Sequence, residues 1–144
     1  MRIIGGDLKG KKLLIPLDKS TRPLKDMVRE SIFNILNHSS KVSKNINNSK
    51  VLDLFSGTGS FGIECLSRGA KEVIFFENYS NSLKILKKNI FNSKLEDKTK
   101  VFEVNISSPN TSGLRLFHNP SELSKLVEKI KSVSKNKILV KLPP

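Results

Sequence analysis

Three glycines and one acidic residue have the types and spacing needed to bind a ligand that contains a nucleoside. Gly57, Gly59 and Gly62 form a Gly-x-Gly-x-x-Gly pattern that follows an apolar segment at residues 51–55. The first two glycines allow a sharp turn and the close approach of a ligand, and the third allows a helix to pack close to a strand. A second apolar segment ends at Glu77, whose carboxylate can accept hydrogen bonds from the two hydroxyls of a ribose.

Asp53 lies inside the strand that leads to the glycines, and its charge indicates which cofactor would fit. A carboxylate at this place would repel a pyrophosphate but suits a ligand with a cation or an amine. S-adenosylmethionine therefore fits better than NAD. The alternative is that Asp53 only caps the glycine turn, as Asx residues do. The candidate cofactor-binding residues are Asp53, Ser56, Gly57, Gly59, Gly62 and Glu77.

The elements that must position these residues follow from the apolar pattern. Residues 51–55 and 73–76 are typical of buried strands, and the glycines lead into a helix. Apolar residues recur at intervals of three and four from residue 24 to 36 and again from 80 to 92, which predicts two amphipathic helices. This alternation predicts a parallel sheet with right-handed crossovers, which is a Rossmann-like α/β fold.

The balance of charge favours a nucleic-acid partner. The chain has 26 Lys and Arg against 13 Asp and Glu, and residues 1–50 hold 11 basic and 4 acidic residues, more than half of the excess. Residues 1–16 are typical of a basic hairpin appended to the main sheet. Lys11, Lys12, Arg22 and Arg29 are the candidates for contact with RNA. The alternatives are a generally Lys-rich composition and, for the two arginines, a solvated helix face.

Several classes of protein and site are disfavoured. At 144 residues, of which 37% are hydrophobic, one compact unit is expected. No apolar run approaches the roughly 18 residues that a membrane span requires, and the basic start lacks an apolar signal core, so we expect a cytoplasmic monomer. Cys65 is the only cysteine, and His38 and His118 lie far apart, so no disulfide and no metal site is predicted.

Four groups of residues, in a fixed order, resemble one known family over residues 1 to about 98, two thirds of the chain. They are Met1-Arg2-Ile3-Ile4-Gly5-Gly6 with Lys9-Gly10-Lys11-Lys12-Leu13; Thr21-Arg22-Pro23 with Val28-Arg29-Glu30-Ser31-Ile32-Phe33-Asn34; Val51-Leu52-Asp53-Leu54-Phe55-Ser56-Gly57-Thr58-Gly59 with Gly62; and Leu66-Ser67-Arg68-Gly69-Ala70 before Glu77. The family is RsmD, whose members methylate the N2 amine of a guanine in small-subunit ribosomal RNA with S-adenosylmethionine. The resemblance implies a cofactor pocket lined by Asp53, Gly57, Gly59 and Glu77, and an arm facing RNA at Arg22 and Arg29.

The family also uses an Asp or Asn followed by Pro-Pro-Tyr, which aligns the target amine with the methyl group. This motif is not found in the sequence. The segment Lys141-Leu142-Pro143-Pro144 has the two prolines, but Leu142 offers no side-chain acceptor. Catalytic residues are therefore not predicted, and methyl transfer at the rate of the family is not expected.

Residues from about 102 onward resemble a different family. The segment Val104-Asn105-Ile106-Ser107-Ser108-Pro109-Asn110-Thr111-Ser112-Gly113-Leu114-Arg115 is similar to dihydroorotate dehydrogenases, flavin enzymes built on a (β/α)₈ barrel. That resemblance implies that Ser108 is a base, that Asn105 and Asn110 hold substrate, and that Lys141 contacts the flavin. About 45 residues supply only two of eight barrel strands, so a flavin site cannot close on them.

The two resemblances together predict a fusion with a junction near residues 95–102. The first part is the N-terminal part of an RsmD-like domain, residues 1–98, comprising a basic arm at 1–38 and a cofactor half at 51–98. The second is a βαβ segment at 99–144, with a strand at 100–106, a helix that starts near Pro120 and a strand at 138–140. The leading hypothesis is a ribosomal RNA methyltransferase by ancestry. The alternatives are a non-catalytic cofactor- or RNA-binding remnant and a fragment of an FMN-dependent dihydroorotate dehydrogenase.

Overall fold

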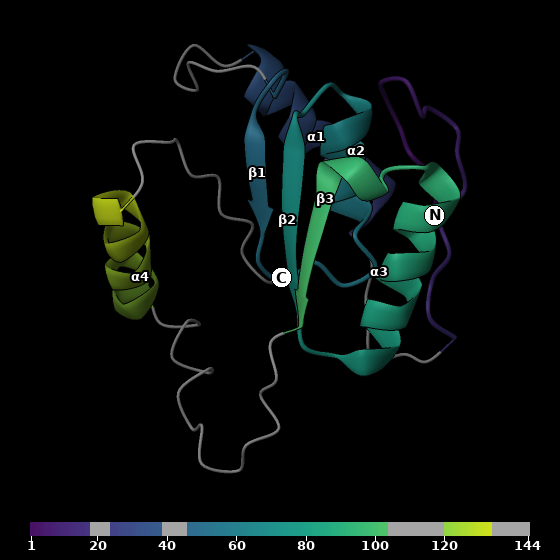
Figure 1. Cartoon of the computed structure of the whole chain (residues 1–144). Coiled ribbons are helices and arrows are strands. Elements are labelled where there is room, and N and C mark those ends of the chain that lie inside the picture. Colours follow the sequence, from purple (N-terminus) through teal and green to yellow (C-terminus); the bar gives the residue numbers. More distant parts are fainter. Residues whose placement is uncertain (18–23, 39–45, 104–119, 134–144) are drawn as a thin grey trace.

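The computed structural model describes residues 1–17, 24–38, 46–103 and 120–133, and its centre is a parallel sheet (Figure 1). The strands are β1 (Lys50–Asp53), β2 (Glu72–Glu77) and β3 (Thr99–Glu103), in the order β1-β2-β3. Val51 lies opposite Val73, which in turn lies opposite Thr99. The predicted parallel arrangement is confirmed for these strands. The strand predicted at residues 138–140 lies outside the described residues.

The helices α2 (Ser60–Ser67) and α3 (Ser80–Ser93) cover one face of the sheet. Val73 and Phe75 of β2 point to this face and are fully buried. A Cβ built on Gly62 of α2 would lie 2.3 Å from the Phe75 ring. A side chain at Gly62 would thus collide with β2, and the prediction that this glycine permits the helix to pack close to the strand is confirmed.

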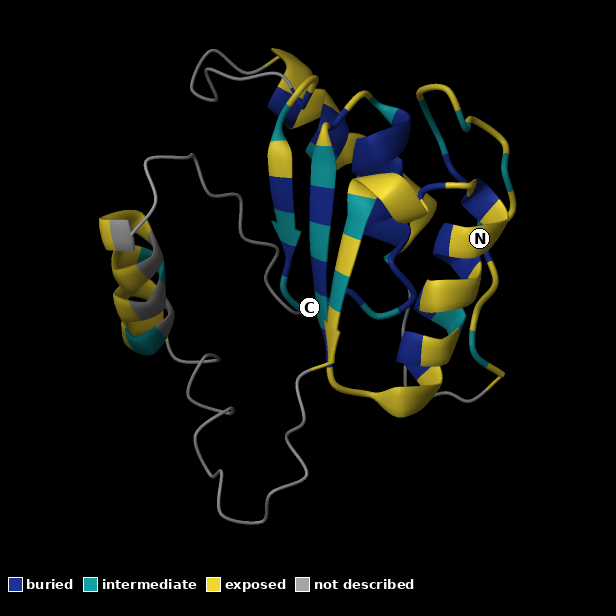
Figure 2. Ribbon diagram, in the orientation of Figure 1, coloured by how far each residue is buried: buried dark blue, intermediate teal, exposed yellow. Residues whose placement is uncertain are grey.

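The opposite face of the sheet carries apolar side chains that are less buried. Ile74 and Phe76 of β2 are half-buried, while Phe102 of β3 is 49% exposed (Figure 2). The rings of Phe76 and Phe102 stack with their centroids 5.1 Å apart. The alternation of buried and partly exposed residues along β2 follows from the period of two in a strand.

The helix α1 (Asp26–His38) contacts α2 through a pair of aromatic rings. Its Phe33 is fully buried and stacks on Phe61 of α2 at a centroid distance of 5.2 Å. The Arg68 guanidinium lies 4.3 Å from the centroid of the same Phe33 ring, in a cation–π contact. Helix α1 begins two residues later than the apolar pattern predicts and ends two residues after it.

The N-terminal segment (residues 1–17) does not extend the sheet as predicted. Its two limbs are antiparallel, with Ile3 N–H donating to Lys11 O and Leu13 N–H donating to Met1 O, but they form only one isolated bridge, between Arg2 and Lys12. The segment lies against α2 and beside α3 instead (Figure 1). Polar contacts to these helices take the place of the predicted sheet edge.

The described residues form two further helices besides α1, α2 and α3. The short 3₁₀ helix η1 (Glu96–Lys98) leads into β3, and α4 (Pro120–Val133) begins with proline, as predicted, because the first helical position does not need a backbone donor. Among the described helices, none is both long enough and apolar enough to cross a bilayer.

Candidate functional site at the carboxyl ends of β1 and β2

The glycine turn connects β1 to α2 and is held to the end of β2. Gly57 and Gly59 have φ angles of 55° and 80°, and the Gly59 N–H donates to Ser56 O at 2.8 Å. Ser56 in turn donates its N–H to Phe76 O at 3.1 Å, and its hydroxyl donates to the same oxygen at 3.2 Å. Ser56, predicted as a cofactor contact, therefore binds the turn to the neighbouring strand β2.

The carboxylate of Glu77 lies directly beside the turn. Its Oε2 accepts the Gly57 N–H at 2.5 Å, and its Oε1 accepts the N–H groups of Asn78 and Tyr79 at 2.9 and 2.8 Å. Glu77 is 9% exposed. A carboxylate has about four lone-pair sites, so three accepted bonds leave capacity for one more donor. The structure thus brings the glycine turn and the acid to one place, as the sequence predicts.

Asp53 ends β1 below the turn and is fully buried. Its Oδ2 accepts the N–H of Gly62 in the first turn of α2 at 3.2 Å. The first N–H groups of a helix have no partner within the helix, and a negative charge there is favourable. Asp53 therefore caps the start of α2, whereas the alternative for Asp53 was a cap on the glycine turn itself. Contact with a ligand stays a prediction for Asp53, as it does for the other five candidates.

A buried amide links the glycine turn to the N-terminal segment. Asn89 of α3 is 1% exposed and donates to Thr58 O at 3.0 Å and to Leu14 O at 3.1 Å. Its Oδ1 accepts the Leu14 N–H at 2.8 Å. Sequence reasoning missed this residue. The signal for it was the recurrence of small polar residues on the face of α3 that also carries Leu86, namely Ser82, Asn89 and Ser93, all of them buried.

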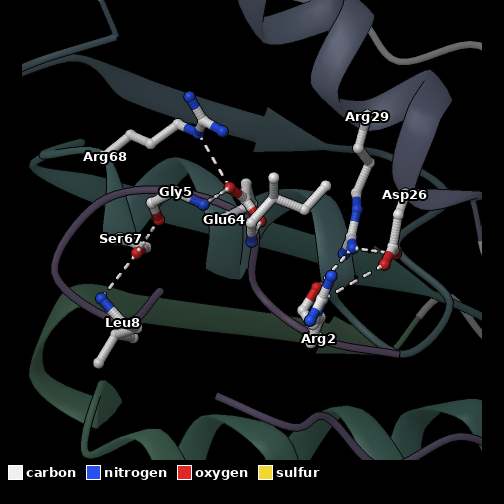
Figure 3. Close-up of polar contacts among 9 residues, drawn as sticks. Arg2, Gly5, Leu8, Asp26, Arg29, Glu64, Ser67 and Arg68 are labelled. Carbon is white, nitrogen blue, oxygen red and sulfur yellow. Dashed lines mark hydrogen bonds and ion pairs between the residues drawn. The ribbon is translucent and has the colours of Figure 1, made fainter. Parts of the chain in front are cut away.

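A second set of polar contacts holds the other limb of the segment to α2 (Figure 3). Glu64 is fully buried and accepts the N–H groups of Ile4 and Gly5, both at 2.8 Å, as well as the Arg68 Nε–H at 2.9 Å. Ser67 accepts the Leu8 N–H and donates to Gly5 O. Glu64 was also missed. A single acid in the otherwise apolar run of residues 61–66 was the available signal.

The structure contradicts the expectation that Arg29 faces RNA. Its side chain is fully buried and its Nη2 donates to Arg2 O at 2.5 Å and to Asp26 Oδ1 at 2.7 Å (Figure 3). A guanidinium held in this way ties α1 to the N-terminal segment and is not available to a phosphate. The sequence pattern failed here because it could not show that residues 1–17 cover this face of α1.

The other candidates for RNA contact differ in their surroundings. Lys12 is exposed, whereas Lys11 is half-buried and its Nζ donates to Asn92 O at the end of α3. Arg22 lies outside the described residues, and so do Asn105, Ser108, Asn110 and Lys141. Contact with RNA stays a prediction for Lys11, Lys12 and Arg22.

Cys65 is a buried residue of α2, directly after Glu64. Burial raises the pKa of its thiol well above the ordinary value, and the negative charges of Asp53 and Glu64 raise it further. The thiol is therefore neutral and behaves as a small buried apolar group, in agreement with its full burial.

Comparison with known proteins places the chain in a family. The family model described as Conserved hypothetical protein 95 matches residues 1–116. The chain belongs to this family. It is 41% identical over 90 residues to the ribosomal RNA small subunit methyltransferase D of Haemophilus influenzae, a match that covers 62% of this chain and 44% of that protein. It is 30% identical over 152 aligned positions to an uncharacterized methylase of Rickettsia prowazekii, covering 99% of this chain and 64% of the relative.

Comparison with solved structures agrees with the comparison of sequences. The structure of Escherichia coli yhhF superposes with a TM-score of 0.60 and 34% identity, over 73% of this chain and 52% of that chain. The sheet and this neighbour agree with a Rossmann-like methyltransferase fold, whereas continuation as a barrel segment finds no support. The chain spans about half the length of several curated relatives that it matches.

The family match bears on the predicted fusion. It continues to residue 116, beyond the junction predicted near residues 95–102. The resemblance to dihydroorotate dehydrogenases rests on residues outside those described. The fusion, its junction and its two predicted parts therefore stay predictions.

Proposed function

We propose that this chain holds the cofactor-binding half of an S-adenosylmethionine-dependent methyltransferase that acts on small-subunit ribosomal RNA. The observation that carries the proposal is the contact between Glu77 and Gly57, which joins an acid at the end of one strand to a glycine turn at the end of the next. Ligands of open α/β sheets bind at the carboxyl ends of the strands. The names of the relatives support ribosomal RNA as the substrate.

The described residues suit this cofactor. Glu77 keeps an acceptor site beyond its three backbone bonds, and this site would receive a ribose hydroxyl. Asp53, buried beneath the turn, gives the site a negative potential that favours the cationic sulfonium over a pyrophosphate. S-adenosylmethionine supplies a methyl group activated on its sulfur. The chain's own contribution is to fix the turn through Ser56 and Asn89 so that the cofactor meets a prearranged backbone.

The substrate side of the proposal rests on the N-terminal segment. Its exposed lysines lie on a part of the chain with a net positive charge, and Asn89 and Glu64 hold that part at a fixed place relative to the glycine turn. RNA phosphates are attracted to such a surface. The N2 amine of a guanine is the proposed acceptor of the methyl group, and no described residue is assigned to align it.

Calorimetric titration with S-adenosylmethionine tests the cofactor site. The variant Glu77→Gln should weaken binding about 10- to 100-fold, because hydrogen bonds to a charged group contribute about 1.5–3 kcal/mol. The matched control is Glu72→Gln, at the opposite end of the same strand, where Glu72 pairs with Lys50 and Lys100 instead.

Comparison of the two variants separates the role of a carboxylate at the carboxyl end of β2 from a general effect of lost charge. Binding by Glu72→Gln should equal that of the wild type. Equal affinities for wild type and Glu77→Gln, both folded by circular dichroism, would remove Glu77 from the site. Absence of any saturable heat with the wild type would overturn the proposed function as a whole.

A further inference from the structure

The outer face of α3 carries a group of lysines and one largely exposed aromatic side chain. Lys84, Lys87 and Lys88 are exposed, and the helix contains no acidic residue. Spacings of three and four place side chains on one stripe of a helix, so Phe91 lies on the stripe with these lysines. Phe91 is 70% exposed. The stripe therefore combines positive charge with a single solvent-facing aromatic ring.

The N-terminal segment packs beside the same helix. The Nζ of Lys11 donates to Asn92 O, one residue after Phe91, and both Leu14 backbone groups bond to Asn89 in the preceding turn. Figure 1 shows the segment running along α3. The segment contributes the exposed Lys9 and Lys12, and Lys94, directly after the helix, is exposed as well.

We propose that the outer face of α3 is a second contact surface for RNA, on which Phe91 stacks against an unpaired base and the flanking lysines contact phosphates. The proposal rests on the proposed function, because it names how the same substrate would be held. Single-stranded RNA is recognised by aromatic rings for the bases and by cations for the backbone. Both groups are present here at the spacing of one helix turn.

The helix dipole and solubility explain only part of this surface. Lysines near the carboxyl end of a helix are favourable to its dipole, and exposed lysines improve solubility. Neither effect accounts for an aromatic ring left largely in water among them. A protein partner would require a wider apolar patch, and the exposed neighbours of Phe91 along the helix are Lys87, Lys88 and Asn92. The isolated ring among cations fits a nucleobase better.

Fluorescence anisotropy with a labelled single-stranded RNA of mixed sequence tests the ring. Phe91→Ala should weaken binding about 5- to 100-fold, the loss expected for one stacked base. Phe91→Tyr should restore binding, whereas Phe91→Leu, which is apolar but cannot stack, should not. Because Phe91 is largely exposed, these variants should fold as the wild type does.

The salt dependence tests the lysines. Each phosphate contact to a single strand contributes about 0.7 to the slope of log affinity against log salt. Changing Lys84, Lys87 and Lys88 together to Gln should therefore reduce the size of this slope by about 2. The control carries the same loss of charge at Lys71, Lys129 and Lys131, which are exposed on other parts of the structure. Its slope should change by less than half as much.

The outcomes separate this proposal from the proposed function. Unchanged RNA affinity in Phe91→Ala, or equal slopes for the two triple variants, would overturn the role of α3. If Lys11→Gln with Lys12→Gln then still flattens the slope, RNA binds on the N-terminal segment alone and the proposed function stands. Binding of S-adenosylmethionine without any RNA binding by the wild type would reject both the α3 surface and the RNA substrate.

Discussion

The amide of Asn89 should be among the most important polar side chains for stability, because it joins α3 to both the glycine turn and the N-terminal segment. The informative perturbation is Asn89→Leu, which keeps the volume of the side chain and removes all three hydrogen bonds. The two bonds to Leu14 are made by the backbone of a residue that is 44% exposed, so water can replace them, and their loss costs about 0.5–1.5 kcal/mol each.

The third bond is more costly to lose. Thr58 is 3% exposed, so its carbonyl would remain buried without the amide, at about 1–3 kcal/mol. Burial of the apolar leucine offsets part of this loss in the free energy of unfolding. We therefore expect the free energy of unfolding to fall by about 2–5 kcal/mol, a large share of the stability of a small domain.

Urea unfolding followed by far-ultraviolet circular dichroism measures this change. The control is Asn92→Leu, on the same helix with an exposed side chain, which should change stability by no more than about 0.5 kcal/mol. The amide proton of Leu14 should also exchange faster with solvent in Asn89→Leu. A loss of under about 0.5 kcal/mol in Asn89→Leu, or equal losses in the two variants, would refute the reasoning.

Two further predictions concern the packing and titration of α2. Gly62→Ala should lower the free energy of unfolding by about 1–3 kcal/mol, because the new Cβ would lie 2.3 Å from the Phe75 ring; an unchanged melting temperature would mean that the helix can move away freely. For Cys65 the folded pKa is raised, so the unfolded chain loses its thiol proton first and stability falls as pH rises above the unfolded value near 9.0. The loss of stability approaches about 1.4 kcal/mol per pH unit and can be measured by urea unfolding at pH 8 to 10. If Cys65→Ala shows the same dependence on pH, other groups cause it.

Much of the sheet and of the glycine turn could be predicted because local patterns determine them. Gly62 sits where a helix must approach a strand, and Glu77 ends an apolar run that pairs in parallel with β1. Each of these features depends on residues close in sequence and on the handedness of crossovers. For the same reason the start of α4 at Pro120 was predictable.

The sites that sequence reasoning missed depend on contacts between distant segments. Arg29 reads as a surface residue of an amphipathic helix until residues 1–17 are seen to cover it, and Glu64 accepts N–H groups about 60 residues away. The N-terminal segment was predicted on the sheet because a hairpin pattern does not reveal which surface it meets. A buried carboxylate or guanidinium with polar partners becomes recognisable only after those partners are placed.

Two-dimensional ¹H–¹⁵N spectra recorded during a titration with S-adenosylmethionine test the central claim most directly. The cofactor should shift the amide signals of Gly57, Gly59, Asn78 and Tyr79, all of which lie at or beside the Glu77 carboxylate and the turn. These signals should follow one saturable curve, while those of α4 should not move. Saturable shifts confined to other elements, with these four signals unchanged, would contradict the assignment of the cofactor site to the carboxyl ends of β1 and β2.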